Sequence, residues 1–385
     1  MQGNEIRLLH LLTSAPHYVI SMLVLLTIVV FIHELGHFWV ARRCGVRVEV
    51  FSVGFGPELF GWTDRFGTRW KFSAIPLGGY VKMFGQADRV LEADGRERDM
   101  SDAEKSVAFH HKRVWQRAAI VFAGPAANYV LTLVSLAILY AAVGIGATPQ
   151  RSIVGEVVEG SVAAQAGLQV GDRILSVNGQ PAELFEQLLT AVTGSNGQVL
   201  QLRIQRGTEQ IELSAQPRLE DETPGDPSKK TYRLGIKAAT EYERQSIGQA
   251  CSMAVSQTIQ ASGQILVALW EMITGTRSSK ELGGILRIAA IAGDVAKQSY
   301  VDFLFLIPSL SLNLGLLNLF PIPLLDGGHL TFYAIEAVRG RPLGERAQEW
   351  GLRIGVALVL GLMVFATWND LVFFKVVDYI KNLVT

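Results

Sequence analysis

The sequence has little charge, little histidine and almost no cysteine. Charged residues make up 18% of its 385 residues, and 35 Lys and Arg balance 35 Asp and Glu. A neutral chain without a basic stripe lacks the electrostatic footprint of nucleic-acid binding, so we expect no nucleic-acid partner. The two cysteines, Cys44 and Cys251, fall in segments that we place on opposite sides of a bilayer, so no disulfide is expected.

Apolar residues are abundant instead, and they gather in long runs. They make up 49% of the chain. A membrane-spanning helix needs about 20 mainly apolar residues. The fold class we predict is therefore a multi-pass α-helical membrane protein with about four transmembrane helices. The first run is not a cleaved signal peptide, because it is too long and Arg42 and Arg43 follow it. The four runs are Tyr18–Val40, Ala118–Gly146, Phe303–Leu325 and Ile354–Phe374.

The first run contains the motif HELGH, residues 33–37, and Glu34 is its only formally charged residue. A charge at the centre of a membrane helix costs about 2.5–3.5 kcal/mol on insertion scales, so it needs a compensating partner. Histidines four residues apart lie on one helix face, where His33 and His37 can bind one Zn²⁺ and Glu34 can act on water. With seven histidines, a chance HExxH is on the order of 1 in 100. A decoy motif inside a membrane helix is unexpected, so the pattern predicts an intramembrane zinc site.

A catalytic zinc site needs a third protein ligand and one open position. Asp326, in the run NLFPIPLLDGG at the end of the third apolar segment, is the candidate. The first and third segments run toward the same membrane face, which places Asp326 at the depth of the two histidines. The two prolines of this run break the helix and would make room for water. Cys44 could also bind metal, but it lies beyond the span and lacks a CxxC partner, so a structural role is favoured.

Several asparagines lie in these apolar segments, where each has an energetic cost. Asn313 and Asn318 are expected to face the cavity, and Asn318 could hold the substrate backbone or the developing oxyanion. Hydrogen bonding between helices is the alternative for both. For Asn128, in the small-residue stretch AGPAAN of the second segment, packing is the favoured role and a link to the active site is the alternative. His329, just past the Gly pair, is interpreted as a structural residue.

The segment from Val46 to Met83 alternates apolar and polar residues with Gly and Pro between them, which is typical of short strands joined by tight turns. Beside the first span, such a hairpin would be partly embedded in the membrane, where non-helical backbone must line a cavity or pack on protein. An exposed strand edge could pair with an extended substrate. A plain cytoplasmic loop is the alternative. Residues from Gln86 to Glu104 are polar and predict a linker.

Residues from Ser152 to Ala238 form an ordinary soluble module with five strand-like runs and a helical stretch at Glu183–Val192. The sequence GSVAAQAGLQVGDRILSVNGQPA resembles a PDZ domain of the bacterial, circularly permuted type. Arg233-Leu234-Gly235-Ile236 resembles the loop that captures a peptide C-terminus in such domains. Peptide binding and exclusion of substrates by size both remain open. Residues in the turn positions of the PDZ pattern are Gly167, Gly171, Asp172, Asn178 and Gly179.

The distribution of arginine and lysine predicts the orientation in the membrane. Basic residues follow the first span, precede the second and lie between the third and fourth, so these loops are expected in the cytoplasm. Both termini and the PDZ-like module are then extracytoplasmic, and the active site lies toward the cytoplasmic side. The predicted domains are a first transmembrane helix (1–45), a re-entrant β-hairpin with linker (46–112), a second transmembrane helix (113–148), the PDZ-like domain (150–240), amphipathic helices on the membrane surface (241–300), and the third (301–338) and fourth (350–380) transmembrane helices.

The motifs HELGH, FAGPAANYVL and NLFPIPLLDGG, with the PDZ-like insert, together resemble the site-2 protease family of intramembrane zinc metalloproteases. The resemblance is closest to the bacterial regulator-of-sigma-E protease group and covers essentially the whole chain. It implies His33, His37 and Asp326 as zinc ligands and Glu34 as the catalytic base. The well-known members of that group carry two tandem PDZ domains, whereas this chain has length for one, so gating that needs two does not transfer.

The resemblance also implies a substrate site and a biological role. Asn318 would contact the substrate, and Gly54-Phe55-Gly56 would lie in a membrane re-entrant hairpin, so the candidate substrate-binding residues are Asn318, Asn313, Gly54, Phe55 and Gly56. The implied function is regulated intramembrane proteolysis, in the bacterial inner membrane, of single-span proteins such as anti-sigma factors or remnant signal peptides. The substrate helix must unwind, and the PDZ-like module would exclude substrates that still carry bulky outer domains.

Two functions of other classes remain possible. A membrane zinc transporter could use intramembrane His and Asp, but it would need ligands along a path and gives no role to Glu34. A catalytically idle scaffold could bind partners through its PDZ-like module. The first is distinguished by transport that survives Glu34→Gln, and the second by partner binding that survives loss of His33 or Glu34.

Overall fold

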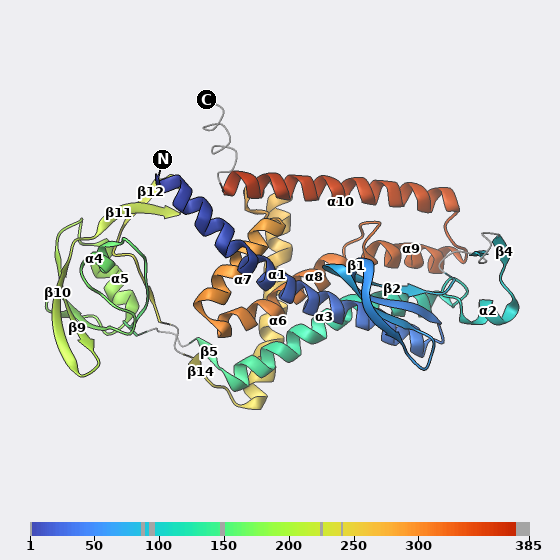
Figure 1. Ribbon diagram of the computed structural model, residues 1–385, viewed down its shortest axis with the longest axis horizontal. Coiled ribbons are helices and arrows are strands. Elements are labelled where there is room, and N and C mark those ends of the chain that lie inside the picture. Colours follow the sequence, from blue (N-terminus) through green and yellow to red (C-terminus); the bar gives the residue numbers. More distant parts are fainter. Residues whose placement is uncertain are drawn as a thin grey trace, which may run out of the picture. The chain divides into compact units, whose positions relative to one another are not determined.

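The computed structural model describes residues 2–85, 89–91, 97–146, 151–223, 226–239 and 242–374. The chain forms two compact units, one made of Met1–Leu139 with Ile247–Thr385 and the other of Tyr140–Ser246 (Figure 1). We call the first the helical unit and the second the inserted unit. Part of the predicted linker, residues 86–88 and 92–96, and residues 375–380 of the predicted fourth transmembrane helix lie outside the described residues.

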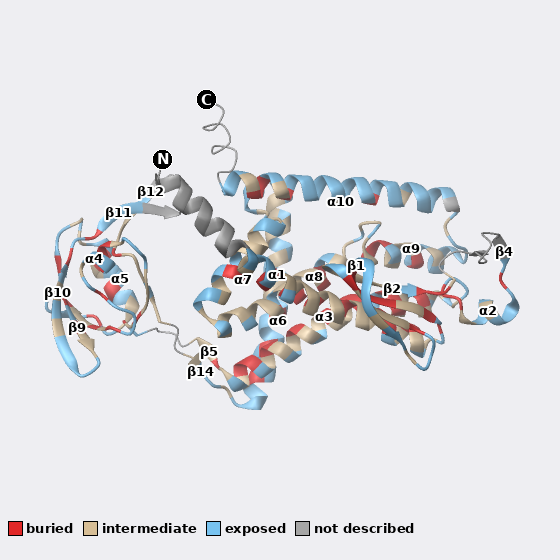
Figure 2. Cartoon of the chain, viewed as in Figure 1, coloured by how far each residue is buried: buried red, intermediate tan, exposed pale blue. Residues whose placement is uncertain are grey.

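Four helices in the described part of the helical unit are long and apolar enough to cross a membrane, at Pro16–Arg43, Val114–Ala142, Tyr300–Asn318 and Arg346–Phe373. They belong to α1 (Gln2–Arg43), α3 (Val114–Ala142), α8 (Tyr300–Asn318) and α10 (Glu345–Phe373). Helix α10 is exposed along most of its length, although its window is as apolar as the others (Figure 2). An exposed apolar helix surface of this kind suits a lipid environment.

The predicted third transmembrane helix, 301–338, is two helices in the structure. α8 ends at Asn318, and α9 (Asp326–Arg339) begins at the predicted ligand itself. Pro321 and Pro323 have no N–H to donate, and Leu324 adopts a φ of 111°. The helical hydrogen bonds therefore stop at Asn318 and resume at Asp326. This break places the Asp326 carboxylate at a helix start instead of on a continuous helix.

The segment between the inserted unit and α8 holds a long helix, α6 (Ile247–Thr274), a short 3₁₀ turn η1 (Ser279–Glu281) and α7 (Ile285–Gln298). α7 packs on α1 and α8 through a cluster that includes Leu25 and Ala292. Asp370 of α10, which is fully buried, accepts hydrogen bonds from the backbone N–H groups of Gly284, Leu286 and Arg287. The first turn of α7 is thereby capped by α10. The expected position of these helices on a membrane surface stays a prediction.

The segment 46–83 is one long hairpin rather than several short strands. β1 (Val48–Thr63) and β2 (Arg69–Met83) meet at one turn, and residues 50–53 lie beside both 79–82 and 69–72. Gly54, Gly56 and Gly78 have positive φ, which lets both strands bend without ending. The hairpin therefore folds back on itself around Phe51, which is buried and stacks on Trp70 with ring centroids 4.4 Å apart. In the described residues no other strand pairs with this hairpin, so 79–83 forms an edge.

Helices α1 and α3 cross at very short range. A Cβ at Gly36 would lie 2.2 Å from the carbonyl oxygen of Ala123, so only glycine fits there. Between the hairpin and α3 lie β3 (Arg89–Leu91), β4 (Glu97–Asp99) and α2 (Asp102–Val107). The crossing brings the HELGH motif of α1 against the AGPAAN stretch of α3. The site described below lies at this contact.

The inserted unit is built around a four-stranded sheet in the order β10-β9-β7-β8. In β9, Leu200, Leu202 and Ile204 are buried and their neighbours are exposed or half-buried, as expected for a strand with one face on a core. Gly167, Gly171, Asn178 and Gly179 all have positive φ, consistent with their predicted turn positions. The elements are β5 (Ile145–Gly146), β6 (Val154–Val157), α4 (Val162–Gln165), β7 (Arg173–Val177), β8 (Gln180–Pro181), α5 (Phe185–Thr193), β9 (Leu200–Arg206), β10 (Glu209–Ala215), β11 (Arg218–Thr223), β12 (Asp226–Arg233), β13 (Ile236–Ala238) and β14 (Tyr242–Glu243).

Candidate metal centre

Three potential metal ligands converge between α1 and α9. Nε2 of His33 and Nε2 of His37 lie 3.2 Å apart, and Oδ2 of Asp326 lies 3.1 Å from the first and 3.5 Å from the second. Both histidines are buried, with exposed fractions of 7% and 9%. Among the residues that the structure describes, this is the one group of three such side chains whose ligand atoms come together. The structure therefore joins the three residues predicted as ligands.

These distances fit a tetrahedral zinc ion. Ligand atoms about 2.0–2.1 Å from zinc at tetrahedral angles lie about 3.3 Å from one another, which is the spacing of the three atoms here. Oδ2 of Asp326 is buried and has no hydrogen-bond partner in the described part of the chain. A buried carboxylate oxygen without a partner is costly. A cation among the three atoms would satisfy it, and two imidazoles with one carboxylate suit zinc.

The His37 ring is oriented by the backbone of α3. Nδ1 of His37 lies 2.9 Å from the carbonyl oxygen of Ile120, which can only accept, so Nδ1 carries the proton. Nε2 then presents its lone pair toward His33 and Asp326. A backbone acceptor at the second ring nitrogen is the usual way in which proteins fix the tautomer of a metal-binding histidine. Ile120 could not be predicted for this role, because only its backbone takes part.

The His33 ring is contacted by Asn128, which is fully buried in α3. Nδ2 of Asn128 lies 3.2 Å from Nδ1 of His33, while no described residue pairs with Oδ1 of Asn128. A 180° turn of the amide exchanges Nδ2 and Oδ1. Oδ1 then accepts from Nδ1–H, and Nε2 of His33 is left with a lone pair for a metal. The alternative considered for Asn128, a link to the active site, is what the geometry supports, and its backbone carbonyl also receives the Ser311 hydroxyl.

The three ligands form one wall of a cavity of about 530 Å³. Glu34 and Asn318 line the same cavity, as does the edge segment of β2 through Tyr80 and Val81. The backbone of Val81 interacts with the Glu34 carboxylate. The hairpin edge, the predicted base and the predicted ligands thus surround one space.

Other predicted residues lie elsewhere. Asn313 does not line this cavity, and its amide donates to the carbonyl oxygen of Ser309 one turn earlier. Gly54, Phe55 and Gly56 belong to the bend of β1, and in the described residues they are not part of the cavity lining.

Sequence reasoning missed two histidines of this cavity. His329, interpreted as structural, lines it, and so does His110. The signal for His329 was its spacing of three residues from Asp326, which places both on one face of α9. His110 precedes α3 in a turn and carried no such signal.

The inserted unit has a cleft of its own, of about 550 Å³. One side is α5, with Leu188 and Val192, and the other is the loop Arg233-Leu234-Gly235-Ile236 that the sequence predicted to capture a peptide C-terminus. Gly235 adopts a φ of 79°, and a Cβ there would lie 2.3 Å from the Cβ of Ser161, so the loop needs glycine at this point.

Comparison with known proteins gives matches over most of the chain. The model of peptidase family M50 matches residues 21–362. A protein of Agrobacterium fabrum is 40% identical over 364 residues, 92% of this chain and 95% of its own. One of Rhizobium meliloti is 40% identical over 377 residues, 94% and 98% of the two chains. Their names describe both provisionally as zinc metalloproteases. The metalloprotease MmpA of Caulobacter vibrioides is 37% identical over 394 residues, 95% and 98% of the two chains.

Two solved structures resemble about a quarter of the chain. They are PDZ domains of SdrC-like proteins, one from Listeria monocytogenes (18% identical, 25% of this chain, 94% of that chain, TM-score 0.20) and one from Listeria innocua (22% identical, 24% and 97%, TM-score 0.21). These TM-scores are too low for the likeness to carry an argument.

Proposed function

The chain belongs to peptidase family M50, and from this premise we propose that it hydrolyses peptide bonds of single-span membrane proteins inside the membrane. It is a membrane zinc metalloprotease, as its family and its relatives at about 40% identity indicate. The observation that carries the proposal is the convergence of His33, His37 and Asp326 at 3.1–3.5 Å on the wall of a cavity that also holds Glu34. The described residues contain a single ligand cluster, and it lies beside a carboxylate, which suits hydrolysis better than transport along a path.

The proposed mechanism assigns each role to a residue of this chain. When bound, zinc supplies Lewis-acid polarisation of the scissile carbonyl and lowers the pKa of water at the site. Glu34 takes the proton from the attacking water and later gives it to the leaving amine. Asn318, on the same cavity, donates its amide to the substrate carbonyl as negative charge develops there.

The substrate is proposed to bind as an extended strand. A helical segment hides its carbonyls in its own hydrogen bonds, so it must unwind before cleavage. Residues 79–83 of β2 form a sheet edge that borders the cavity through Tyr80 and Val81. Backbone pairing along this edge would hold an unwound segment next to the ligands, whatever its sequence.

The biological role is proposed to be regulated intramembrane proteolysis. Anti-sigma factors or remnant signal peptides, already trimmed outside by another protease, are the proposed substrates. The cytoplasmic side is proposed for the active site and the opposite side for the inserted unit, from the distribution of basic residues. The inserted unit is proposed to be a PDZ-like domain that excludes untrimmed substrates or binds a peptide C-terminus in its cleft.

The decisive test uses the full chain in lipid vesicles with a labelled single-span substrate. The native chain is expected to cut within the span, and Glu34→Gln to bind zinc but not to cut. Asn318→Ala is expected to keep zinc and lower kcat by about 10²–10³, the usual cost of one lost oxyanion donor. Equal cleavage by the native chain and Glu34→Gln would refute the mechanism. Zinc flux that survives Glu34→Gln, without cleavage, would establish a transporter instead.

A further inference from the structure

An apolar groove runs along the outer side of the α1–α3 crossing, and no role above uses it. Its volume is about 800 Å³, within the range of about 300–1,000 Å³ typical of ligand pockets. The floor is made of small residues such as Gly36, Ala123 and Ala126. Its rim is exposed, with exposed fractions of 58% for Val130 and 50% for Val134. A groove of this composition in a membrane helix pair faces lipid.

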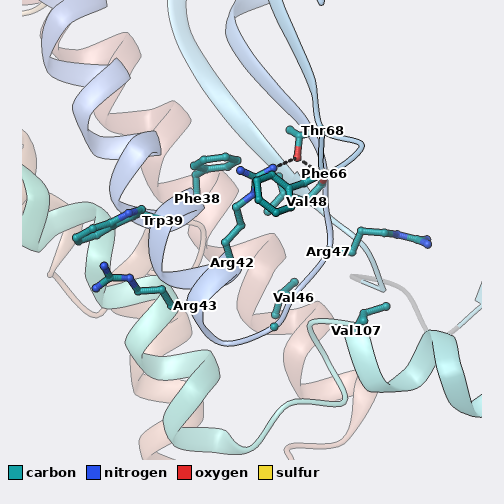
Figure 3. Close-up of a pocket in the computed structure, with 11 residues that line it drawn as sticks. Phe38, Trp39, Arg42, Arg43, Val46, Arg47, Val48, Phe66, Thr68 and Val107 are labelled. Carbon is teal, nitrogen blue, oxygen red and sulfur yellow. Dashed lines mark hydrogen bonds between the residues drawn. The ribbon is translucent and has the colours of Figure 1, made fainter. Parts of the chain in front are cut away.

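A second cavity lies at the end of α1, and Trp39 lines both this cavity and the groove. This second cavity, of about 570 Å³, is shown in Figure 3. Trp39 and Arg43 lie together on one flank, Arg42 points toward Thr68 in the turn between β1 and β2, and Arg47 points away on the other side. Beyond Trp39, at and just after the end of the candidate span Pro16–Arg43, the second cavity is lined by three arginines.

Of these arginines, Arg43 is the one that lies against Trp39 and therefore beside the groove. Arg42 donates to Asp64 at 2.6 Å, and Arg47 lies 4.0 Å from Glu49. No described carboxylate lies within 4.0 Å of Arg43. Its guanidinium instead lies 3.8 Å from the centroid of the exposed Trp39 ring. An aromatic residue and a cation at the end of a membrane helix are typical of the depth of lipid headgroups.

We propose that the groove and Arg43 together bind one anionic phospholipid, with the phosphate group at Arg43 and an acyl chain in the groove. The dimensions agree. From Ala119 to Val134 the groove follows α3 for about 22 Å at about 1.5 Å per residue, more than the roughly 15 Å of hydrocarbon in one leaflet. The charge agrees as well, because the described lining of the groove carries no charged residue and Arg43 lies at its Trp39 end. A transmembrane protein helix in the groove would have no use for that cation.

The test measures lipid binding rather than proteolysis. Native mass spectrometry of the detergent-solubilised full chain would follow binding of phosphatidylglycerol and of phosphatidylcholine with identical acyl chains. Phosphatidylglycerol should bind more tightly. Arg43→Gln should weaken its binding about fivefold, the effect of one basic residue near an anionic lipid. Val130→Trp, at an exposed rim position, should weaken both lipids because it narrows the groove, and Ala126→Phe provides a second blocking variant.

The chain offers a matched control for charge. Arg353 lies 5.6 Å from the Trp350 ring centroid, so it repeats the Arg–Trp contact of Arg43 and Trp39. Its charge, however, is neutralised by Glu349. Arg353→Gln should leave lipid binding unchanged. Equal effects of Arg43→Gln and Arg353→Gln would overturn the proposal in favour of nonspecific attraction. Displacement of phosphatidylglycerol by millimolar inorganic phosphate would also overturn it. So would lipid binding that is unchanged in both Val130→Trp and Ala126→Phe.

Discussion

Gly124 of α3 lies directly against the ring of His37 of α1. A Cβ at Gly124 would lie 2.3 Å from Nε2 of His37 and 2.9 Å from Cε1 of His33. Real side chains do not approach so closely, so the absence of a side chain at Gly124 leaves the space in which the ligand atoms meet. A single glycine of α3 thus determines whether the histidines can take their positions.

Replacing Gly124 with alanine is expected to abolish zinc binding and proteolysis. The added methyl group forces at least one imidazole away from Asp326. The helix itself should not suffer, because alanine is favoured over glycine in a helix by about 1 kcal/mol. Zinc content by atomic emission and cleavage of a single-span substrate measure the outcome. Gly361→Ala in α10, where a Cβ meets nothing within 4 Å, is the control and should retain both. A Gly124→Ala protein with full zinc content would disprove this role.

Loss of the Asn128 amide is expected to weaken zinc binding without unfolding the chain. Asn128→Leu keeps the volume but removes the acceptor that holds the His33 tautomer. Removing such a partner of a metal ligand usually costs about 10–100-fold in affinity. Competition with a chelator gives the zinc affinity. Asn313→Leu is the matched control and should leave zinc affinity unchanged, since among the described residues that amide donates to Ser309 within α8. Equal affinities for the two variants would assign Asn128 to packing.

Removing zinc is expected to lower the melting temperature of the full chain. The ligands join α1 to α9, so the ion stabilises the folded state by mass action, about 2.7 kcal/mol at a free concentration 100 times Kd. Asp326→Ala should melt at the same temperature with and without a chelator. Glu34→Gln should still respond to the chelator, because Glu34 is not proposed as a ligand. A chelator response that persists in Asp326→Ala would mean that zinc binds elsewhere.

The metal cluster could be predicted because its information is local. The i, i+4 spacing of His33 and His37 is a property of one helix, and the depth of Asp326 follows from the order of the spans. In the structure the ligand atoms of these three residues lie within 3.5 Å of one another. What the sequence could not specify depends on how separate elements cross. Ile120 contributes only a carbonyl oxygen, and Gly124 contributes the lack of a Cβ, so neither has a side chain to signal its role.

The fold was predictable to a similar degree. Four apolar runs correspond to four helices of suitable length and composition. The run NLFPIPLLDGG predicted a broken backbone, but its consequence, two helices with Asp326 at the start of the second, depends on the φ of 111° at Leu324. The glycines of the hairpin sequence predict turns between short strands. They are bends within two long strands instead, because pairing of 50–53 with two segments keeps the strands continuous.

In the inserted unit, the ion pair between Asp172 and Arg206 makes the stability of the fold depend on pH. Asp172 is buried and accepts hydrogen bonds from Arg206 at 2.7 Å and from the N–H of Gln169. Burial alone would raise the pKa of Asp172, but these donors hold its pKa below the ordinary value. A carboxyl whose folded pKa is depressed stabilises the fold above its unfolded pKa, about 3.9. That stability is lost as the pH falls from there through the folded pKa.

We therefore expect the inserted unit of the native chain to lose stability below about pH 4, when Asp172 becomes protonated. Hydrogen exchange of the β7 and β9 amides in the full chain, corrected for its intrinsic pH dependence, reports this directly. Arg206→Gln should destabilise the inserted unit near neutral pH, because it removes the donor to the buried Asp172 carboxylate. Asp172→Asn should be less stable than the native chain at every pH. Its stability should not fall further in acid on account of this site, because residue 172 no longer titrates. An acid response of the same size in Asp172→Asn would place the titrating group elsewhere.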